Sequence, residues 1–434
     1  MEKLAELVWG TPAMVLLLAV GMLLTWETRA VQVRKLGASI RQVGRSLRSG
    51  SRSSFQAVCT ALAATVGTGN IAGVAGAIAL GGPGAVFWMW VSAFFGMATK
   101  YAEVVLAMRY RIRGADGTYL GGPMYYIRRG MGERWKPLAA VFALCTVLAS
   151  FGMGNIAQVH TIAASVTLAL PRAKPFAAAL GTGLATALIV ALVTLGGAKR
   201  IGAVMERIVP VMALMYVLGA LAVVGAHWRS LGQVLSAIVQ GAFCPRAVLG
   251  GGAGIGIRQA VRWGVSRGIF SNEAGLGSAP IAHAAAEAGP EAQGLLGIFE
   301  VFADTVVLCT LTALAILCSG VPIAYGQPAG AELAAAALET VFGARAAVLS
   351  ALCLGLLALA TLISWQLYGV RCAEYLWGDT GVQIYRICYV AVVVLGATMN
   401  LRSAWAVSDL LNGLMCLPNL LALLALRHET KLVN

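Results

Sequence analysis

Long apolar runs recur along almost the whole chain and leave little sequence for anything else. A helix needs about 20 mainly apolar residues to cross the hydrocarbon core of a bilayer. Hydrophobic residues make up 59% of the chain and charged residues only 12%, about half the charged share of a soluble protein. The sequence therefore predicts an all-α polytopic membrane protein without a sizeable soluble domain. Eleven runs reach or approach the required length: 12–27, 55–80, 84–109, 138–170, 176–196, 203–226, 260–287, 295–319, 345–377, 383–400 and 404–427.

The basic residues indicate how these spans are oriented. The net charge is +14, and Lys and Arg gather at 29–52, 109–136 and 199–207, after spans one, three and five. Such loops face the cytoplasm, so we expect the N-terminus outside and the C-terminus in the cytoplasm. This clustering accounts for the positive charge without a nucleic-acid partner. Arg229, Arg246 and Arg258 oppose the rule mildly in the outward segment, where Val234–Phe243 is expected to form an interfacial helix.

Two other features have simple interpretations. The run Pro12–Trp26 follows Glu2 and Glu6 and precedes no A-x-A site, so we expect a retained span rather than a signal peptide. The nine cysteines show neither CxxC nor metal-ligand spacing. We interpret them as small buried residues rather than disulfides or ligands.

The second apolar run is interrupted by Thr65-Val66-Gly67-Thr68-Gly69-Asn70. Glycine weakens a helix by about 1 kcal/mol relative to alanine, and an open backbone in lipid persists only against protein, water or ligand. Free N–H and C=O groups at one point could hold an anionic group together with a small cation. Alternatively, Gly69 and Gly73 form a GxxxG face for helix packing. The residues alone leave both interpretations open.

A similar interruption, from Arg267 to Gly277, lies in the seventh run. If span one is an addition, each interruption opens a set of five spans, and corresponding spans of the two sets run in opposite directions. Paired interrupted spans are the best sequence pointer to the binding site of a secondary transporter. The expected organisation is an N-terminal helix and basic loop (1–53), a first five-helix repeat (54–226), an extracytoplasmic loop (227–259), a second five-helix repeat (260–427) and a cytoplasmic tail (428–434).

The polar residues inside the spans suggest what is bound. Span two has no Asp or Glu between Phe55 and Ala79, so a carboxylate suits the amides around Thr68, Gly69 and Asn70 better than a lone amine does. Gln158 lies on a polar stripe of span four and offers both a donor and an acceptor, although packing between helices would also use it. In span nine, Thr361, Ser364 and Trp365 share a face: two hydroxyls suited to Na⁺ and an indole that could wall a small pocket, or pack.

The charged residues of the spans are less informative. Lys100 and Glu103 are expected to neutralise each other, and Glu273 is expected to pair with Arg267 or cap a half-helix. Glu300 and Asp304 are intramembrane acids and hence candidates for function, but the sequence assigns them no role. It contains no HExxH or P-loop motif, and we expect no enzyme activity.

Four stretches together resemble the alanine or glycine:cation symporter family: TVGTGNIAGVAGAIALGGPGAVFWMW, RGIFSNEAGLGSAPIAHAAAE, IFEVFADTVVLCTLTALAIL and TLISWQLYG. The resemblance extends from about Ser54 to Ala425 and implies a leucine-transporter-like architecture with two discontinuous helices and an extra N-terminal helix. It implies a substrate site at Thr68, Gly69, Asn70, Gln158, Phe270, Ser271 and Trp365, and a Na⁺ site at Ala63, Val66, Asn70, Thr361 and Ser364. The run Gln366–Val370 departs from the family pattern in losing polarity.

These observations predict a Na⁺-coupled importer of alanine or glycine in a prokaryotic inner membrane, with Na⁺ as coupling ion and no organic cofactor. Coupling to H⁺ through Glu273, Glu300 or Asp304 is the alternative within transport, and a channel is the next. The expected partners are a small neutral amino acid and the lipid bilayer. The sequence does not predict an oligomeric state.

Overall fold

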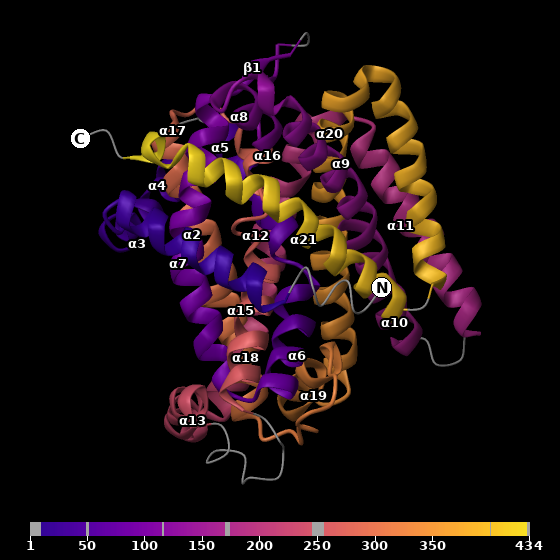
Figure 1. Ribbon diagram of the computed structural model, residues 1–434. Coiled ribbons are helices and arrows are strands. Elements are labelled where there is room, and N and C mark those ends of the chain that lie inside the picture. The colour runs from indigo at the N-terminus through magenta and orange to yellow at the C-terminus, as the bar shows by residue number, and fades with distance from the viewer. Residues whose placement is uncertain are drawn as a thin grey trace.

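The computed structural model describes residues 10–48, 52–114, 117–169, 174–244, 256–399 and 401–431, and these are almost entirely helical (Figure 1). Among them, six helices are long and apolar enough to cross a membrane, and a bent pair gives a seventh. Pro12–Glu27 and Leu410–Ala425 are shorter apolar helices. The predicted helical membrane fold is therefore confirmed, whereas the predicted number of eleven spans is not.

The first half of the chain contains the first broken span and a small hairpin. The strands β1 (Ile112–Arg113) and β2 (Tyr119–Leu120) pair antiparallel. The helices are, in order, α2 (Thr11–Glu27), α3 (Val31–Arg34), α4 (Leu36–Arg48), α5 (Arg52–Thr65), the 3-10 turn η1 (Thr68–Asn70), α6 (Ala72–Gly81), α7 (Gly84–Arg109), α8 (Pro123–Gly130), η2 (Glu133–Trp135), α9 (Lys136–Phe151), the π-helix η3 (Gly152–Ile156), α10 (Ala157–Ala169), α11 (Pro175–Thr194) and α12 (Gly197–Ala226).

The second half contains the other broken span. The predicted helix at Val234–Phe243 is confirmed as part of α13. The predicted spans nine and ten lie in α20, which consists of two helices joined at Gly378, where φ is 64°, and doubles back so that the Tyr389 hydroxyl donates to the Leu362 carbonyl. The elements are η4 (Trp228–Ser230), α13 (Leu231–Phe243), α15 (Ile257–Asn272), α16 (Ala279–His283), α17 (Pro290–Val301), the π-helix η5 (Phe302–Cys309), α18 (Thr310–Cys318), α19 (Ala331–Phe342), α20 (Arg345–Thr398), α21 (Leu401–Ala425) and η6 (Arg427–Thr430).

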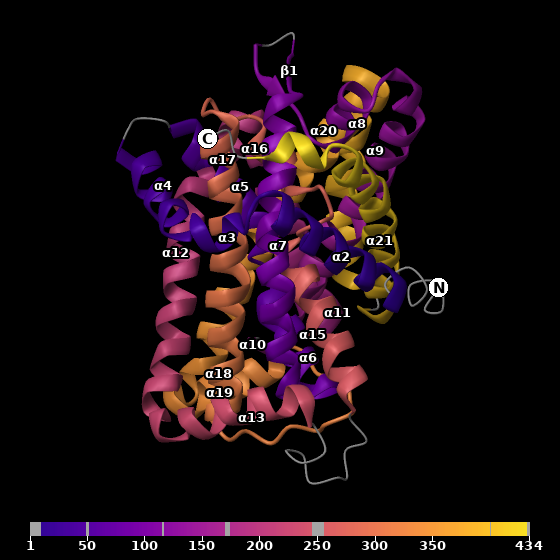
Figure 2. The same cartoon turned by 60° about the vertical axis from the view of Figure 1, so that its left-hand side comes forward.

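The two broken spans run in opposite directions through the molecule, as the sequence predicts. The β-hairpin and α16 lie at one end, whereas α13 and α19 lie at the other (Figures 1 and 2). The pair α5–α6 runs away from the hairpin end, and the pair α15–α16 runs toward it. The halves of both spans consequently meet near the middle of the helix bundle.

Backbone geometry explains why each span breaks where it does. The segment 53–65 meets 68–81 at an angle of 55°, at the predicted Val66–Gly67 position. In the second span α15 continues to Asn272, so the break begins later than the predicted Arg267. It uses left-handed φ angles of 55° at Glu273, 92° at Gly275 and 82° at Gly277. Glycine adopts these angles without the penalty that a side chain brings, so the two glycines fix this break.

Small residues allow the broken span α15 to pack closely on the buried helix α7. A Cβ added at Gly264 would lie 2.3 Å from the Ala85 carbonyl oxygen, and one at Gly268 would lie 2.2 Å from the Ser92 hydroxyl. Close backbone approach of this kind is how helices pack in membranes, where no hydrophobic force drives them together. It holds the second break against α7.

Candidate functional site

Three helices converge on the first break. The hydroxyl of Thr361 in α20 donates a 3.0 Å hydrogen bond to the carbonyl of Ala63, in the last turn of α5. A Cβ added at Gly67 would lie 2.6 Å from Thr361 Oγ1 and 3.7 Å from Gln158 Oε1. Thus α5, α10 and α20 meet where the backbone opens, and Gly67 is glycine because a side chain there would occupy the meeting point.

Three side-chain oxygens near this point have no hydrogen-bond partner among the described residues: Thr68 Oγ1, Gln158 Oε1 and Ser364 Oγ. Each belongs to a residue that is at most 2% exposed. Buried polar atoms in proteins nearly always have a partner, and one without a partner requires an explanation. Unpartnered buried side-chain atoms also occur elsewhere in the described residues, for example at Tyr101 and Asn155, so it is the position of these three on the elements that meet at the first break that suits them to an ion or ligand.

The second broken span contributes a wall to the first break. A Cβ added at Gly69 would lie 3.4 Å from Phe270 Cδ1 and 3.6 Å from the Cα of Ser271. Phe270 is 3% exposed and Ser271 1%. The structure therefore brings together Gly69, Phe270 and Ser271, which the sequence placed in one substrate site.

Trp365 lies between the scaffold helix α20 and the second break. Its indole Nε1–H donates a 3.0 Å hydrogen bond to Glu273 Oε1. On its other side, a Cβ added at Gly154 would lie 2.3 Å from the Cβ of Trp365. Glu273 occupies the C-cap position of α15, as expected, and its second oxygen accepts a hydrogen bond from Ser278. Trp365 is therefore a bridge between two parts of the bundle, in addition to any role as a pocket wall.

The predicted Na⁺ ligands are brought together only in part. Ala63 and Thr361 are in direct contact, and Ser364 follows Thr361 by three residues on the same helix with an unpaired hydroxyl. Asn70 is engaged elsewhere, because its Oδ1 accepts the Gly67 N–H at 2.9 Å and its Nδ2 donates to Asp304 Oδ1 at 2.7 Å. Val66 is buried, with its N–H donating to the Leu62 carbonyl.

Asp304 is the residue whose position the sequence did not reveal. It is fully buried in the π-helix η5, and its Oδ2 accepts hydrogen bonds of 2.8 Å from both Ser271 and Thr305. With Asn70 on Oδ1, one carboxylate joins the first broken span, the second broken span and span eight. The sequence marked Asp304 as a candidate for function because it is an acid inside a span. The sequence could not show that Asp304 contacts both breaks.

The backbone of the second break is held by protein side chains. Glu103 Oε1 accepts the N–H groups of Gly275 and Gly277, each at 3.1 Å, and the Asn419 amide at 2.5 Å. Asn419 also donates to the Gly275 carbonyl, and the Asn272 side chain accepts the Ala274 N–H. Side chains from α7, α15 and α21 thus provide hydrogen-bond partners for the backbone groups that the break exposes.

This arrangement corrects the prediction that Lys100 and Glu103 neutralise each other. Lys100 Nζ instead lies 3.3 Å from Glu300 Oε1, while Glu300 Oε2 lies 3.0 Å from His283 Nε2. Gln293 donates to His283 Nδ1 at 2.7 Å, so Nε2 is the protonated nitrogen that faces Glu300. These contacts hold α16 against α7 and α17. The three-residue spacing of Lys100 and Glu103 on one helix gave no sign that the partner of Lys100 lies on α17.

Both π-helices coincide with the site. Gly154 in η3 packs on Trp365, and η3 ends two residues before Gln158, while η5 contains Asp304. A π-helical segment inside a longer helix often marks a functional site. Here each one widens a span where it faces a break.

Comparison with known proteins assigns the chain to a family. The sequence model of the sodium:alanine symporter family matches residues 1–433. The chain belongs to this family. It is 42% identical to the sodium/alanine symporter AgcS of Methanococcus maripaludis, over 98% of this chain and 95% of that protein. It is 38% identical to a Bacillus subtilis protein named "Probable sodium/glutamine symporter GlnT", over 97% of this chain and 86% of that protein. The protein is thus an integral membrane protein, a cation-coupled amino-acid symporter and not an enzyme.

Solved structures share the fold at low sequence identity. The manganese transporter of Eremococcus coleocola superposes with a TM-score of 0.54 over 88% of this chain and 78% of that chain, at 15% identity. This similarity concerns the helical transporter architecture alone.

Proposed function

We propose that the protein imports small neutral amino acids, alanine or glycine, together with Na⁺ by alternating access. The observation that supports this most directly is the set of unpaired buried oxygens of Thr68, Gln158 and Ser364 around a break in a span without acids. Na⁺ would supply a cation for these oxygens to coordinate, and the ammonium group of a zwitterionic amino acid would supply hydrogen-bond donors to them.

The substrate carboxylate is expected at the start of the turn η1. Thr68 and Gly69 are its first residues, and the leading N–H groups of a helical turn have no acceptor within it. The Thr68 hydroxyl would donate to the carboxylate, and Gln158 Oε1 would accept from the substrate ammonium. Asn70, held by Gly67 and Asp304, would border the site, with Phe270, Ser271 and Trp365 as walls. Walls this close to Gly69 favour a side chain no larger than a methyl group.

The coupling ion is expected between α5 and α20. Carbonyl and hydroxyl oxygens are the ligands that small hard cations prefer, and Ala63, Val66, Thr361 and Ser364 offer them, with Asn70 toward the substrate. One Na⁺ entering across 100 mV releases about 2.3 kcal/mol, and a tenfold gradient adds about 1.4 kcal/mol. The sum supports roughly 500-fold accumulation, so one ion per substrate would suffice.

A cavity at the hairpin end supports alternating access. Its volume is about 640 Å³, and its lining comes from α5, α12, α16 and α20 and from the β-hairpin. Gln56 and Thr60 line it on α5, one turn before Ala63. The basic residues Lys199 and Arg371 also line it, which fits an opening toward the cytoplasm, with the N-terminus outside. The two five-helix repeats, 54–226 and 260–427, would then be the units that move about the breaks.

Coupling to H⁺ is the second candidate, and one observation favours it. Asp304 is a buried acid that contacts both broken spans through Asn70 and Ser271. A proton on this carboxylate would remove its charge and weaken both contacts, which could link protonation to the breaks.

The test is uptake of radiolabelled alanine into proteoliposomes with Na⁺ and pH gradients imposed separately. The proposal expects uptake driven by the Na⁺ gradient at equal pH, and an Asp304→Asn variant that still responds to Na⁺. Uptake driven by the pH gradient without Na⁺, and lost in Asp304→Asn, would establish the second candidate instead.

A further inference from the structure

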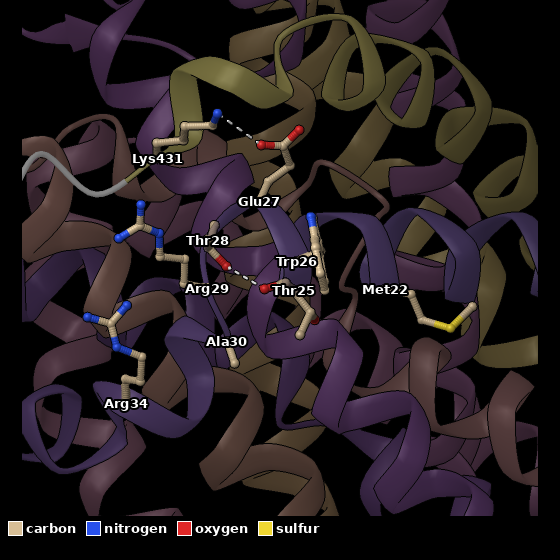
Figure 3. Close-up of a pocket in the computed structure, with 9 residues that line it drawn as sticks. All are labelled: Met22, Thr25, Trp26, Glu27, Thr28, Arg29, Ala30, Arg34 and Lys431. Carbon is tan, nitrogen blue, oxygen red and sulfur yellow. Dashed lines mark hydrogen bonds and ion pairs between the residues drawn. The ribbon is translucent and has the colours of Figure 1, made fainter.

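A pocket at the C-terminal end of α2 combines basic and apolar groups. It has a volume of about 800 Å³ and lies where α2 passes into α3, beside the C-terminal segment (Figure 3). Its lining residues are Met22, Thr25, Trp26, Glu27, Thr28, Arg29, Ala30, Arg34 and Lys431. None of them takes part in the transport proposal.

The charges of this pocket are unbalanced. Glu27 is already engaged, since Lys431 Nζ lies 3.3 Å and Arg427 Nε 3.4 Å from its carboxylate. Arg29 and Arg34 are exposed and form no ion pair within the described residues. Their guanidinium groups extend to the same side of the pocket (Figure 3). Two unpaired arginines side by side form a site for a phosphate group.

The apolar part of the pocket continues a stripe along α2. Trp26 is 83% exposed and Met22 50%, and Val15 on the same helix is 58% exposed. Positions 15, 22 and 26 are spaced by seven and four residues and therefore share one helix face. An exposed apolar face on a helix of a membrane protein suits contact with acyl chains, and tryptophan at its end is typical of the membrane interface.

The backbone directs the basic groups next to this stripe. Arg29 and Ala30 both have left-handed φ angles, 54° and 53°. Two consecutive non-glycine residues in this conformation are strained, and strain of this kind persists where the surrounding structure demands it. The turn places the arginines at the end of the lipid-facing stripe, instead of continuing α2.

We infer that this pocket binds the headgroup of an anionic phospholipid, with Arg29 and Arg34 on the phosphate and the acyl chains along Trp26 and Met22. A soluble phosphate would use the arginines but leave the exposed apolar stripe without a role. A neutral lipid would use the stripe but not the arginines. An anionic phospholipid complements both.

The experiment is native mass spectrometry of the purified full-length protein titrated with dioleoyl phosphatidylglycerol or dioleoyl phosphatidylcholine. We expect wild type to bind the first phosphatidylglycerol more tightly than phosphatidylcholine. Arg29→Gln/Arg34→Gln should weaken that adduct about 25-fold, on the order of fivefold for each arginine. Arg29→Lys/Arg34→Lys should keep most of the affinity, which guards against a folding defect in the Gln variant.

The matched control is Arg134→Gln/Lys136→Gln, which removes the same charge from exposed residues elsewhere and should leave the first adduct unchanged. Equal affinity for the two lipids in wild type would overturn the inference. So would competition by soluble glycerol phosphate at the concentrations at which the lipid binds, or loss of a dimer rather than of a lipid adduct in the Gln variant.

Discussion

The two broken spans are interrupted alike but completed differently. At the second break, Glu103 and Asn272 accept the N–H groups of Ala274, Gly275 and Gly277, and Asn419 donates to the Gly275 carbonyl. At the first, Thr68 Oγ1 and its neighbours Gln158 Oε1 and Ser364 Oγ have no partner among the described residues. The backbone of the first break is also bonded within the protein, since the Gly67 N–H donates to Asn70 and the Ala63 carbonyl accepts from Thr361. The difference lies in these unpaired side-chain oxygens, which we propose a ligand completes.

This difference divides the work between the breaks. In the proposed mechanism the second break is a wall of the substrate site, through Phe270 and Ser271, and the first break is the binding element. Asp304 joins them through Asn70 and Ser271, so an event at one break reaches the other through a single carboxylate. Variants at the first break should therefore alter binding, and variants at the second should alter stability.

The largest effect is expected at Gly69. In Gly69→Leu the side chain would fill the space before Phe270, and alanine binding should be abolished while the protein remains folded. In Gly69→Ala the added Cβ meets Phe270 at 3.4 Å, an ordinary contact, so any loss of affinity reports the ligand. A forced methyl group typically costs about 1–3 kcal/mol, which predicts a Kd weaker by about fivefold to about 150-fold, measured by calorimetry.

Gly73 is the matched control, because it forms the GxxxG pair with Gly69 and its added Cβ would meet only Arg267 Cδ, at 4.0 Å. Gly73→Ala should bind alanine as wild type does. Equal losses in the two alanine variants would favour the packing interpretation of both glycines.

At the second break, Glu103→Ala should lower stability. It leaves the N–H groups of Gly275 and Gly277 and the Asn419 amide without their acceptor, and each unsatisfied buried group costs about 1–3 kcal/mol. The thermal midpoint in detergent should fall, with a loss of at least about 2 kcal/mol of stability. Glu133→Ala, which removes an exposed partner of Arg128, should change stability by less than about 1 kcal/mol. A normal midpoint in Glu103→Ala combined with lost alanine binding would reverse the division between the breaks.

A smaller effect is expected from Thr361→Ala, which removes the hydroxyl next to Ala63. The Na⁺ concentration for half-maximal uptake should rise about tenfold, equivalent to about 1.4 kcal/mol, with little change in expression. Thr398→Ala provides the comparison, since its hydroxyl also bonds within α20 but is exposed. Unchanged Na⁺ dependence in Thr361→Ala would remove this residue from the ion site.

The smallest effect is a change of selectivity at Trp365. Trp365→Ala should weaken alanine binding and improve competition by leucine and methionine against labelled alanine, by about fourfold for each methylene accommodated, or 0.8 kcal/mol. Trp365→Phe, which keeps a ring but loses the hydrogen bond to Glu273, should leave the ranking of amino acids closer to wild type. An unaltered ranking in both variants would assign Trp365 to packing and direct attention to Phe270.

The residues alone predicted the membrane class and the two breaks, because apolar length and glycine spacing are local properties, whereas the placing of Gly69 and Phe270 in one site came from the family resemblance. The sequence placed the second break several residues too early, since helix α15 is held against α7 as far as Asn272 by contacts that no local pattern encodes. The pairing of Lys100 was wrong for the same reason: Glu103 lies one turn away, yet Glu300 from a distant span is the partner. Asp304 was recognised as unusual, but its contacts depend on how three spans pack.

The most direct test of the account is equilibrium binding of alanine to the purified protein in Na⁺ and in K⁺ at equal ionic strength and pH. If the first break and α20 hold substrate and ion together, alanine should bind at least tenfold more tightly in Na⁺, and Thr361→Ala should lose most of that difference while Thr398→Ala keeps it. Equal affinity for alanine in the two salts would contradict a Na⁺ site coupled to the first break.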